Sequence, residues 1–557
     1  MATTDEHGRG AAPSSSAGDP LMALEAMLTQ EDRQSLPEPP RRELSIPRVL
    51  TALLVLALLC GGGFLALRRA TAGAESIAAP WFAPYVDTTL TPTYPFEDAS
   101  ANPARDAVLG FVVSAPKSPC TPSWGAYYTL EEAASALDLD RRIAQARGDG
   151  GEVMVSFGGQ ANSELAVVCK NQTALLDAYR SVVKRYKLKT IDLDIEGAAL
   201  TDSQANTRRA TAIAALQRTS TSHAGLAVWL TLPVTPTGLE PEAVEVIASM
   251  LSAHVKLAGV NVMAMDFNSS SRTDEDMLGA VEGALNATHG QLMATYLRAG
   301  IRYSAAQVWN HLGVTVMIGQ NDVPGERFGL AEARELAAFV RSEHLARTSI
   351  WSLNRDSSCG AVLQDTNAAS NTCSGTAQSP LEFTHVFSAL TGSVPAASAA
   401  QNSSSAEAIP QLTQADADDP AQSPYPIWSA AASYRTGYKV VWHHEVYEAK
   451  WFSQAQVPDA PVSSQWNTAW ELIGPVLPGE HAPKLPTLPA GTYPAWSTNS
   501  IYSKGQRVLF DGLPYKAKWY SRDEPPSESG SAVAESAESG QTPWQPLFTI
   551  PGEPSPE

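Results

Sequence analysis

Residues 190–197 read Thr-Ile-Asp-Leu-Asp-Ile-Glu-Gly. Three carboxylic acids, Asp192, Asp194 and Glu196, alternate with three aliphatic residues. Successive side chains of a β-strand point to opposite faces, so the three acids line one face. No basic residue is interleaved to offset their mutual repulsion. The pattern therefore favours a functional site, in which carboxyl groups share protons and have shifted pKa values, over a solvated strand face.

The surrounding chain, from Trp81 to about Gly392, alternates short apolar runs with amphipathic stretches such as 130–146, 174–186 and 332–344. Eight strands alternating with helices predict an α/β fold of the (β/α)8 (TIM barrel) type. An open doubly wound sheet is the alternative, but the first run lacks the Gly-rich turn of its nucleotide-binding version. The expected strands are 81–88, 107–114, 152–158, 190–196, 226–233, 259–266, 314–318 and 349–353.

In a parallel barrel, the side chains of the acidic strand have defined inward and outward directions. Its three aliphatic residues pack outward against helices, and its three acids point into the barrel. Glu196 then lies at the C-terminal end of the strand, where barrel enzymes keep their catalytic groups. Like charges at close range cannot all ionise, so at least one proton is retained. The uppermost carboxyl group can then act as a general acid near neutral pH.

Four short motifs resemble those of glycoside hydrolase family 18, the chitinases and their relatives. The acidic strand matches the last three acids of Asp-x-x-Asp-x-Asp-x-Glu, with Lys189 in place of the first. Ser156-Phe157-Gly158-Gly159 matches Ser-x-Gly-Gly on the preceding strand. Met263-Ala264-Met265-Asp266 matches Met-x-Tyr-Asp, except that Met265 replaces the Tyr. Trp351 matches the Trp that ends the eighth strand. The resemblance covers about Trp81–Gly392.

The resemblance implies hydrolysis with retention, in which the substrate's own N-acetyl group is the nucleophile. It assigns proton donation to Glu196, the acetamido N–H to Asp194, and the tuning of Asp194 to Asp192. It also implies that Asp266 contacts the acetamido group or the neighbouring sugar. Trp351 would form the apolar floor of the −1 subsite. Ser156, Gly158, Met263 and Met265 are expected to line the substrate site, and no metal or cofactor is expected.

The Tyr hydroxyl missing at Met265 is one that would bind the acetamido carbonyl. Tyr85, Tyr127 or Tyr128 could replace it from a nearby loop. The segment Trp124–Tyr128 is also a candidate loop for stacking on sugars. Ordinary packing beside Cys120 is the alternative for that segment.

Five cysteines are present, and Cys60 lies in an apolar run. The other four show no CxxC or metal-like spacing, which indicates two disulfides formed in an oxidising compartment. The pairs expected are Cys120–Cys169 and Cys359–Cys373, although sequence alone leaves the connectivity open.

The N-terminal region has two parts. Residues 1–45 are rich in Pro, Ser, Glu and Arg and are expected to be disordered. Residues 49–67 are uncharged and approach the ~20 residues that a membrane helix needs. A signal anchor over 46–70 is expected, which would place the rest of the chain at the cell surface. Cleavage near Ala72-Gly73-Ala74, which would release a secreted protein, is the alternative.

The barrel domain is expected over 78–395, followed by a linker over 396–424. An internal repeat then occurs at a spacing of 68 residues, as in Tyr447-Glu448-Ala449-Lys450-Trp451 and Tyr515-Lys516-Ala517-Lys518-Trp519. These copies resemble the small chitin- and cellulose-binding modules of carbohydrate-binding families 5 and 12. We expect a first all-β module over 425–475, a linker over 476–492, a second module over 493–549 and a tail over 550–557.

Aromatic residues in the two modules are candidates for stacking on pyranose faces or for filling the small cores. Within the adjacent pairs Trp451-Phe452 and Trp519-Tyr520, strand alternation predicts one core ring and one exposed ring. The candidates are Trp428, Trp451, Phe452, Trp470, Trp496, Trp519, Tyr520 and Trp544.

The net charge of −19 argues against a nucleic-acid partner, because phosphate binding needs clustered Lys and Arg. The expected partner is chitin or another N-acetylglucosamine polysaccharide, bound by a monomer. The leading prediction is a chitinase that cleaves β-1,4 links between N-acetylglucosamine units. The alternatives are a non-catalytic chitin-binding lectin or adhesin, and an endo-β-N-acetylglucosaminidase acting on glycoprotein glycans.

Overall fold

The computed structural model describes residues 77–219, 225–267, 277–360, 368–390, 418–460, 462, 467–526, 543–549 and 551–554. The predicted disordered segment and the predicted membrane anchor lie outside these residues, as does most of the predicted linker 396–424.

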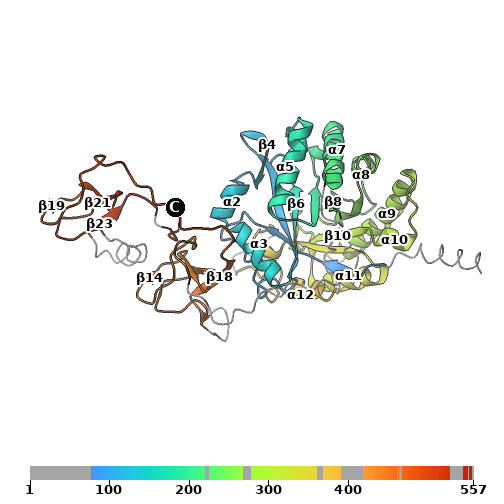
Figure 1. Ribbon diagram of the computed structural model, residues 1–557. Helices are drawn as coiled ribbons and strands as arrows, with labels where there is room; N and C mark the ends of the chain where they lie inside the picture. The colour runs from blue at the N-terminus through green and yellow to red at the C-terminus, as the bar shows by residue number, and fades with distance from the viewer. Residues whose placement is uncertain are drawn as a thin grey trace, which may run out of the picture. The chain divides into compact units, whose positions relative to one another are not determined.

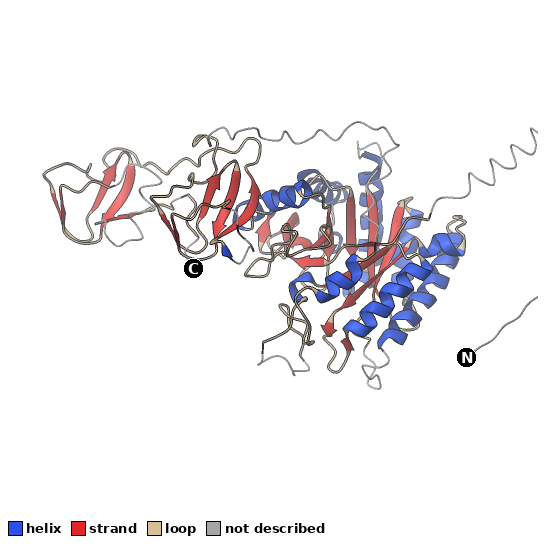
Figure 2. Ribbon diagram, turned by 90° about the horizontal axis from the view of Figure 1, so that it is seen from below, coloured by secondary structure: helices blue, strands red, loops and turns tan. Residues whose placement is uncertain are grey.

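Parallel strands close into a barrel with helices on its outside (Figures 1 and 2). The first strand is split into β1 (Trp81–Phe82), which pairs with β13, and β2 (Tyr85–Asp87), which pairs with β3, and this closes the ring. The predicted (β/α)8 barrel is therefore confirmed. The other strands, in order around it, are β3 (Ala107–Ala115), β6 (Val153–Gly158), β7 (Thr190–Asp194), β8 (Ala227–Pro233), β9 (Leu257–Met263), β10 (Leu312–Met317) and β13 (Arg347–Trp351).

Amphipathic helices cover the outer faces of these strands and form one continuous apolar core with them. Strands β6 and β7 are buried along their whole length, as expected for strands packed on both faces. The helices of eight or more residues are α3 (Leu139–Gly148), α5 (Gln172–Arg185), α7 (Ser203–Thr219), α8 (Pro241–Ser252), α9 (Met277–Arg298) and α11 (Leu330–Glu343). The shorter ones are α2 (Leu130–Ala136), α4 (Leu165–Val168), α6 (Ala198–Thr201), α10 (Ala305–Trp309) and α12 (Glu382–Ser388).

The structure differs from the sequence prediction at two places near the second barrel strand. The helix expected over 130–146 is two helices, α2 and α3, because Asp138 between them has a left-handed φ of 48°. In addition, β4 (Ser118–Trp124) pairs antiparallel to β3, and β5 (Tyr128–Thr129) pairs antiparallel to β4, which extends the sheet. Both disulfides form as expected, and Cys120–Cys169 ties β4 to the end of α4.

The expectation of a membrane anchor, and with it of a cell-surface location, is corrected. Within the ranges that the structure describes, no helix is both long and apolar enough to cross a bilayer. The predicted span at 46–70 is not among those residues.

The two C-terminal repeats form small β-sheets with the same strand plan. The first module contains β14 (Ser433–Tyr434), β15 (Lys439–Trp442), β16 (Glu445–Ala449), β17 (Ser453–Gln454) and β18 (Trp470–Pro475). The second contains β19 (Ile501–Tyr502), β20 (Arg507–Phe510), β21 (Leu513–Ala517), β22 (Ser521–Arg522) and β23 (Trp544–Pro546). Each has a three-stranded and a two-stranded sheet around its own apolar cluster.

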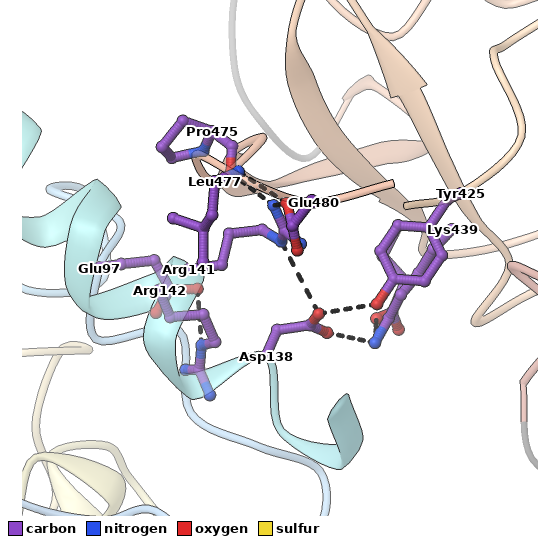
Figure 3. A network of polar contacts seen from close by, with 10 residues as sticks. Glu97, Asp138, Arg141, Arg142, Tyr425, Lys439, Pro475, Leu477 and Glu480 are labelled. Atoms are coloured by element: carbon purple, nitrogen blue, oxygen red, sulfur yellow. Dashed lines mark hydrogen bonds and ion pairs between the residues drawn. The ribbon is translucent and has the colours of Figure 1, made fainter. Parts of the chain in front are cut away.

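Helix α3 of the barrel contacts the first module through a polar network (Figure 3). Asp138 accepts a hydrogen bond from the Tyr425 hydroxyl at 3.0 Å and pairs with Lys439. Arg141 pairs with Glu480 in the segment that follows β18. Gly474 of β18 has a φ of 138°, and a Cβ there would lie 2.9 Å from the carbonyl oxygen of Arg141. The first module thus approaches the helix by its backbone as well as by ion pairs.

Candidate active site

A cleft of about 250 Å³ opens at the C-terminal ends of the barrel strands. It brings together the motif residues Asp194, Glu196 and Trp351, which come from strands β7 and β13 and the loop after β7. The remaining lining residues are Tyr85, Phe111, Gln160, Thr231, Pro233, Val234, Met263, Met265, Asp266, Thr315, Met317 and Asp322.

Asp192 lies at the base of the cleft and is fully buried. Its Oδ2 accepts hydrogen bonds from Tyr85 Oη at 2.8 Å and Ser156 Oγ at 2.7 Å. Its Oδ1 accepts from Thr231 Oγ1 and from Arg347 Nη1, both at 2.7 Å. Four donors occupy the four lone-pair sites of this carboxyl group, which is the surrounding of an ionised acceptor.

Asp194 and Glu196 share a hydrogen bond above Asp192. Burial raises the pKa of Asp194 well above its ordinary value, and the charges of Glu196 and Asp192 add to this. Burial also raises the pKa of Glu196 to about 7, although the hydrogen bond with Asp194 opposes the shift. Glu196 is partly exposed at the mouth of the cleft. A carboxyl group that keeps its proton near neutral pH and faces a cleft is suited to general acid catalysis.

The glycines of the Ser156–Gly159 motif allow the neighbouring strands to meet closely. Gly158 has a φ of 105°, and a Cβ there would lie 2.0 Å from the carbonyl oxygen of Asp194. Gly159 donates its N–H to that oxygen at 3.0 Å. The motif therefore fixes the backbone that carries Asp194. The motif residue Ser156 was predicted to line the substrate site. It contacts Asp192 and is fully buried, so it supports the acidic strand and does not contact a ligand.

The third motif contributes Asp266 and two methionines to the lining of the cleft. Asp266 has a left-handed φ of 53°, and its Oδ1 accepts a hydrogen bond from Val323 N–H at 3.1 Å. Burial raises its pKa, and repulsion from Asp322 acts in the same direction. Met263 and Met265 line the cleft and are partly exposed. The position where a Tyr hydroxyl was expected is therefore apolar.

Trp351 forms an aromatic wall together with Phe111, whose ring stacks on it at a centroid distance of 5.5 Å. Tyr85 meets the edge of the Trp351 ring at 6.1 Å. The Tyr85 hydroxyl contacts Asp192 and Arg347, and the residue lines the cleft, so a contact between Tyr85 and the substrate stays a prediction.

Trp124 is also reassigned. Its side chain is fully buried and donates from Nε1 to Tyr186 Oη at 2.9 Å. The packing alternative holds for this residue, and it does not stack on sugars. Tyr127, in the same segment, is 75% exposed.

The module aromatics divide into core and surface rings. Trp428, Trp470 and Trp544 are buried, and Trp496 is partly buried. The predicted alternation within each adjacent pair is wrong, because both rings are exposed in both modules. Each pair lies in the turn after a strand ends, where alternation no longer applies. These rings are Trp451, Phe452, Trp519 and Tyr520, with 41%, 62%, 40% and 59% of their surface exposed.

Phe111, Gln160, Asp322 and Arg347 belong to the site or its base and were not singled out from the sequence. For Arg347 a signal was present. Arg347, Ser349 and Trp351 alternate with Thr348 and Ile350, which places the arginine on the same inward face as Trp351.

No family model matches the chain. Over 284 residues it is 36% identical to a probable bifunctional chitinase/lysozyme of Escherichia coli, an alignment that covers 49% of this chain and 31% of that protein. Over 284 residues it is 34% identical to endochitinase 11 of Metarhizium anisopliae, covering 49% of this chain and 52% of that protein. The catalytic domain of a Pyrococcus furiosus chitinase has 25% identity and a TM-score of 0.48, with 56% of this chain and 97% of that chain covered.

The chain thus spans about a third of one curated relative and about half of the other. About half of this chain is similar in sequence to proteins named as chitinases.

Proposed function

We propose that the barrel is a chitinase that hydrolyses β-1,4 links between N-acetylglucosamine units. The observation that carries this is the pair Asp194 and Glu196, a buried carboxyl group bonded to a partly exposed one whose pKa is raised to about 7. The aromatic wall at Trp351 provides an apolar surface of the kind on which a pyranose ring stacks. The similarity to named chitinases agrees with this chemistry.

In the proposed mechanism, Glu196 donates its proton to the glycosidic oxygen as that bond breaks. The acetamido carbonyl oxygen of the substrate attacks the anomeric carbon and forms an oxazolinium ion, with Asp194 holding the acetamido N–H. Glu196 then takes a proton from water as the water opens the ion, and the configuration of the anomeric carbon is retained. Asp266, which lines the same cleft, is proposed to contact the acetamido group or the neighbouring sugar.

The two C-terminal modules are proposed to bind the insoluble polymer. Trp451 and Phe452 in the first module and Trp519 and Tyr520 in the second present large apolar rings to solvent. Two such surfaces on one chain raise the effective concentration of the barrel at a chitin surface without any new contact in the cleft.

Product release by the full chain tests this proposal against its alternatives. The purified protein is incubated in parallel with insoluble chitin, with soluble chito-oligosaccharides and with an N-glycosylated protein. Shorter chito-oligosaccharides from the first two substrates support the chitinase. Binding to chitin without any product would instead show a lectin or adhesin. Cleavage confined to the glycoprotein would show an endo-β-N-acetylglucosaminidase.

A further inference from the structure

A buried cation lies at the base of the acidic strand, and the mechanism above makes no use of it. Arg347 opens strand β13, and neither its side chain nor that of Asp192 is exposed. Besides Asp192, its guanidinium contacts Tyr85 Oη through Nη2 at 3.0 Å and Ser349 Oγ through Nε at 3.1 Å. Aromatic rings surround the guanidinium carbon at 5.5 to 5.6 Å, namely those of Trp81, Tyr85 and Trp229.

Four donors of this network reach Asp192, from Tyr85, Ser156, Thr231 and Arg347. Tyr85 Oη and Thr231 Oγ1 also lie 3.0 Å from each other, and either hydroxyl can donate in that contact. Tyr85 and Thr231 each have one hydroxyl hydrogen, and each can give it to Asp192. Their oxygens in turn accept from Arg347 and from Asn261 Nδ2, at 3.0 Å in both cases. Arg347 cannot accept a hydrogen bond, so the direction of the chain is fixed at that end. When both hydroxyls donate to Asp192, these two, Ser156 and Arg347 place one donor at each of its four lone-pair sites.

We propose that Arg347 is a positioning residue that holds Asp192 as a permanent anion, so that the remaining proton of the acidic strand is confined to Asp194 and Glu196. The inference rests on the proposed function, because it gives that proton its place at the mouth of the cleft. It differs from a simple structural role, in which the arginine would only fill the barrel.

The electrostatic reason is local. Burying a guanidinium is costly unless it is paired and hydrogen-bonded. Asp192 is its counter-ion, Tyr85 and Ser349 accept its other hydrogen bonds, and the aromatic rings add cation–π contacts. The anion that results then lies below Asp194, which favours a proton on the upper pair. Among the described residues, the other titratable or charged groups that face these carboxyl groups are Tyr85 of β2, Asp266 after β9 and Asp322 after β11 (Gly319–Gln320).

The direct test is the pH dependence of kcat/KM for soluble chito-oligosaccharides in Arg347→Met. Arg347 lowers the pKa of Asp194, so loss of the cation raises the macroscopic pKa values of the Asp194 and Glu196 pair. We expect both limbs of the profile to move to higher pH, by about one to three units. Arg347→Lys keeps the charge and should keep both limbs near their wild-type positions. A structural role predicts a lower rate at every pH and unmoved limbs.

Arg209→Met is the matched control. Arg209 has 0% exposure, like Arg347, and pairs with Glu164 at 2.9 Å, but it has no contact with the three acids. This variant should be less stable and yet show unmoved limbs. If Arg347→Met does not fold, Tyr85→Phe still distinguishes the positioning role from a purely structural one. It keeps the ring and removes one donor to Asp192, so the limbs should move in the same direction by less than in Arg347→Met.

A readout without substrate separates this inference from the proposed function. Infrared difference spectra of the double variant Asp194→Asn/Glu196→Gln, recorded in mildly acidic buffer with and without the further change Asp192→Asn, should show a carboxylate band and no protonated carboxyl band for Asp192. A protonated carboxyl band that disappears with the Asp192→Asn change would overturn the inference, as would unmoved limbs in both Arg347→Met and Tyr85→Phe. A wild-type protein that cleaves no chito-oligosaccharide would refute the proposed function and leave the infrared result standing.

Discussion

The carboxyl groups of Asp194 and Glu196 share a hydrogen bond where strand β7 ends. Because the pKa of Glu196 is raised to about 7, its proton is present below that pH and is lost above it. We therefore expect kcat/KM for chito-oligosaccharides to fall about tenfold per pH unit above an alkaline limb near 7. A profile that already declines above the ordinary pKa of a glutamic acid would contradict this assignment.

The same raised pKa predicts a pH-dependent stability. The folded state holds the Glu196 proton more tightly than the unfolded state, so the free energy of unfolding falls as pH rises from about 4.5 to about 7. Glu196→Gln has no such proton to lose. Its melting temperature should exceed that of wild type in alkaline buffer, with a difference in unfolding free energy on the order of 2 kcal/mol, and the advantage should shrink in acid.

Calorimetry at two pH values measures this difference. Glu335→Gln is the control, because Glu335 is an exposed residue of α11. It should follow wild type at both pH values. An advantage of Glu196→Gln that stays the same at both would count against the shifted pKa.

Gly158 is predicted to be essential to the position of Asp194. In Gly158→Ala, the new Cβ would lie 2.0 Å from the carbonyl oxygen of Asp194, and φ would stay at a strained 105°. We expect a loss of more than about 2 kcal/mol in stability and about a hundredfold or more in kcat/KM. Gly150→Ala is the matched control, since Gly150 has a φ of 85° and nothing within 4 Å of a Cβ. Equal effects of the two substitutions on kcat/KM would contradict the close-approach argument.

The exposed module aromatics are predicted to retain the protein on chitin. Replacing Trp451, Phe452, Trp519 and Tyr520 together by Ala should raise the apparent Kd for insoluble chitin at least about tenfold, or 1.4 kcal/mol. Hydrolysis of soluble chito-oligosaccharides should be unchanged. Leu297→Ala, at a 58% exposed apolar residue of α9, should bind like wild type. Unaltered retention of the fourfold variant on chitin beads would refute the proposed role of these rings in chitin binding.

The sequence was sufficient to predict the barrel and the inward direction of its three acids, because both depend on local periodicity. Alternation with period two fixes which face Asp192, Asp194 and Glu196 share, whatever the rest of the chain does. The disulfide pairs were also predicted, since Cys359 and Cys373 are close in the chain and Cys120 and Cys169 follow neighbouring barrel strands.

The features that sequence reasoning missed depend on contacts between distant residues or on single backbone angles. Arg347 and Asp192 are 155 positions apart in the chain, so no local sequence pattern predicts that they form a pair. The break between α2 and α3 rests on the positive φ of Asp138. The aromatic segment Trp124–Tyr128 after the second strand suggests sugar stacking, but the hairpin that carries Trp124 turns its ring into the core.

The most direct test of the central claim is the rate at which wild type and Glu196→Gln hydrolyse a soluble chito-oligosaccharide below the alkaline limb. Gln keeps the size and polarity of the side chain but carries no proton of carboxylic acidity. We predict turnover by the wild-type protein and a loss of about 10² to 10⁴-fold in kcat for the variant, with binding of the oligosaccharide retained. Equal rates for the two proteins, or no turnover by either, would contradict the assignment of Glu196 as the catalytic acid.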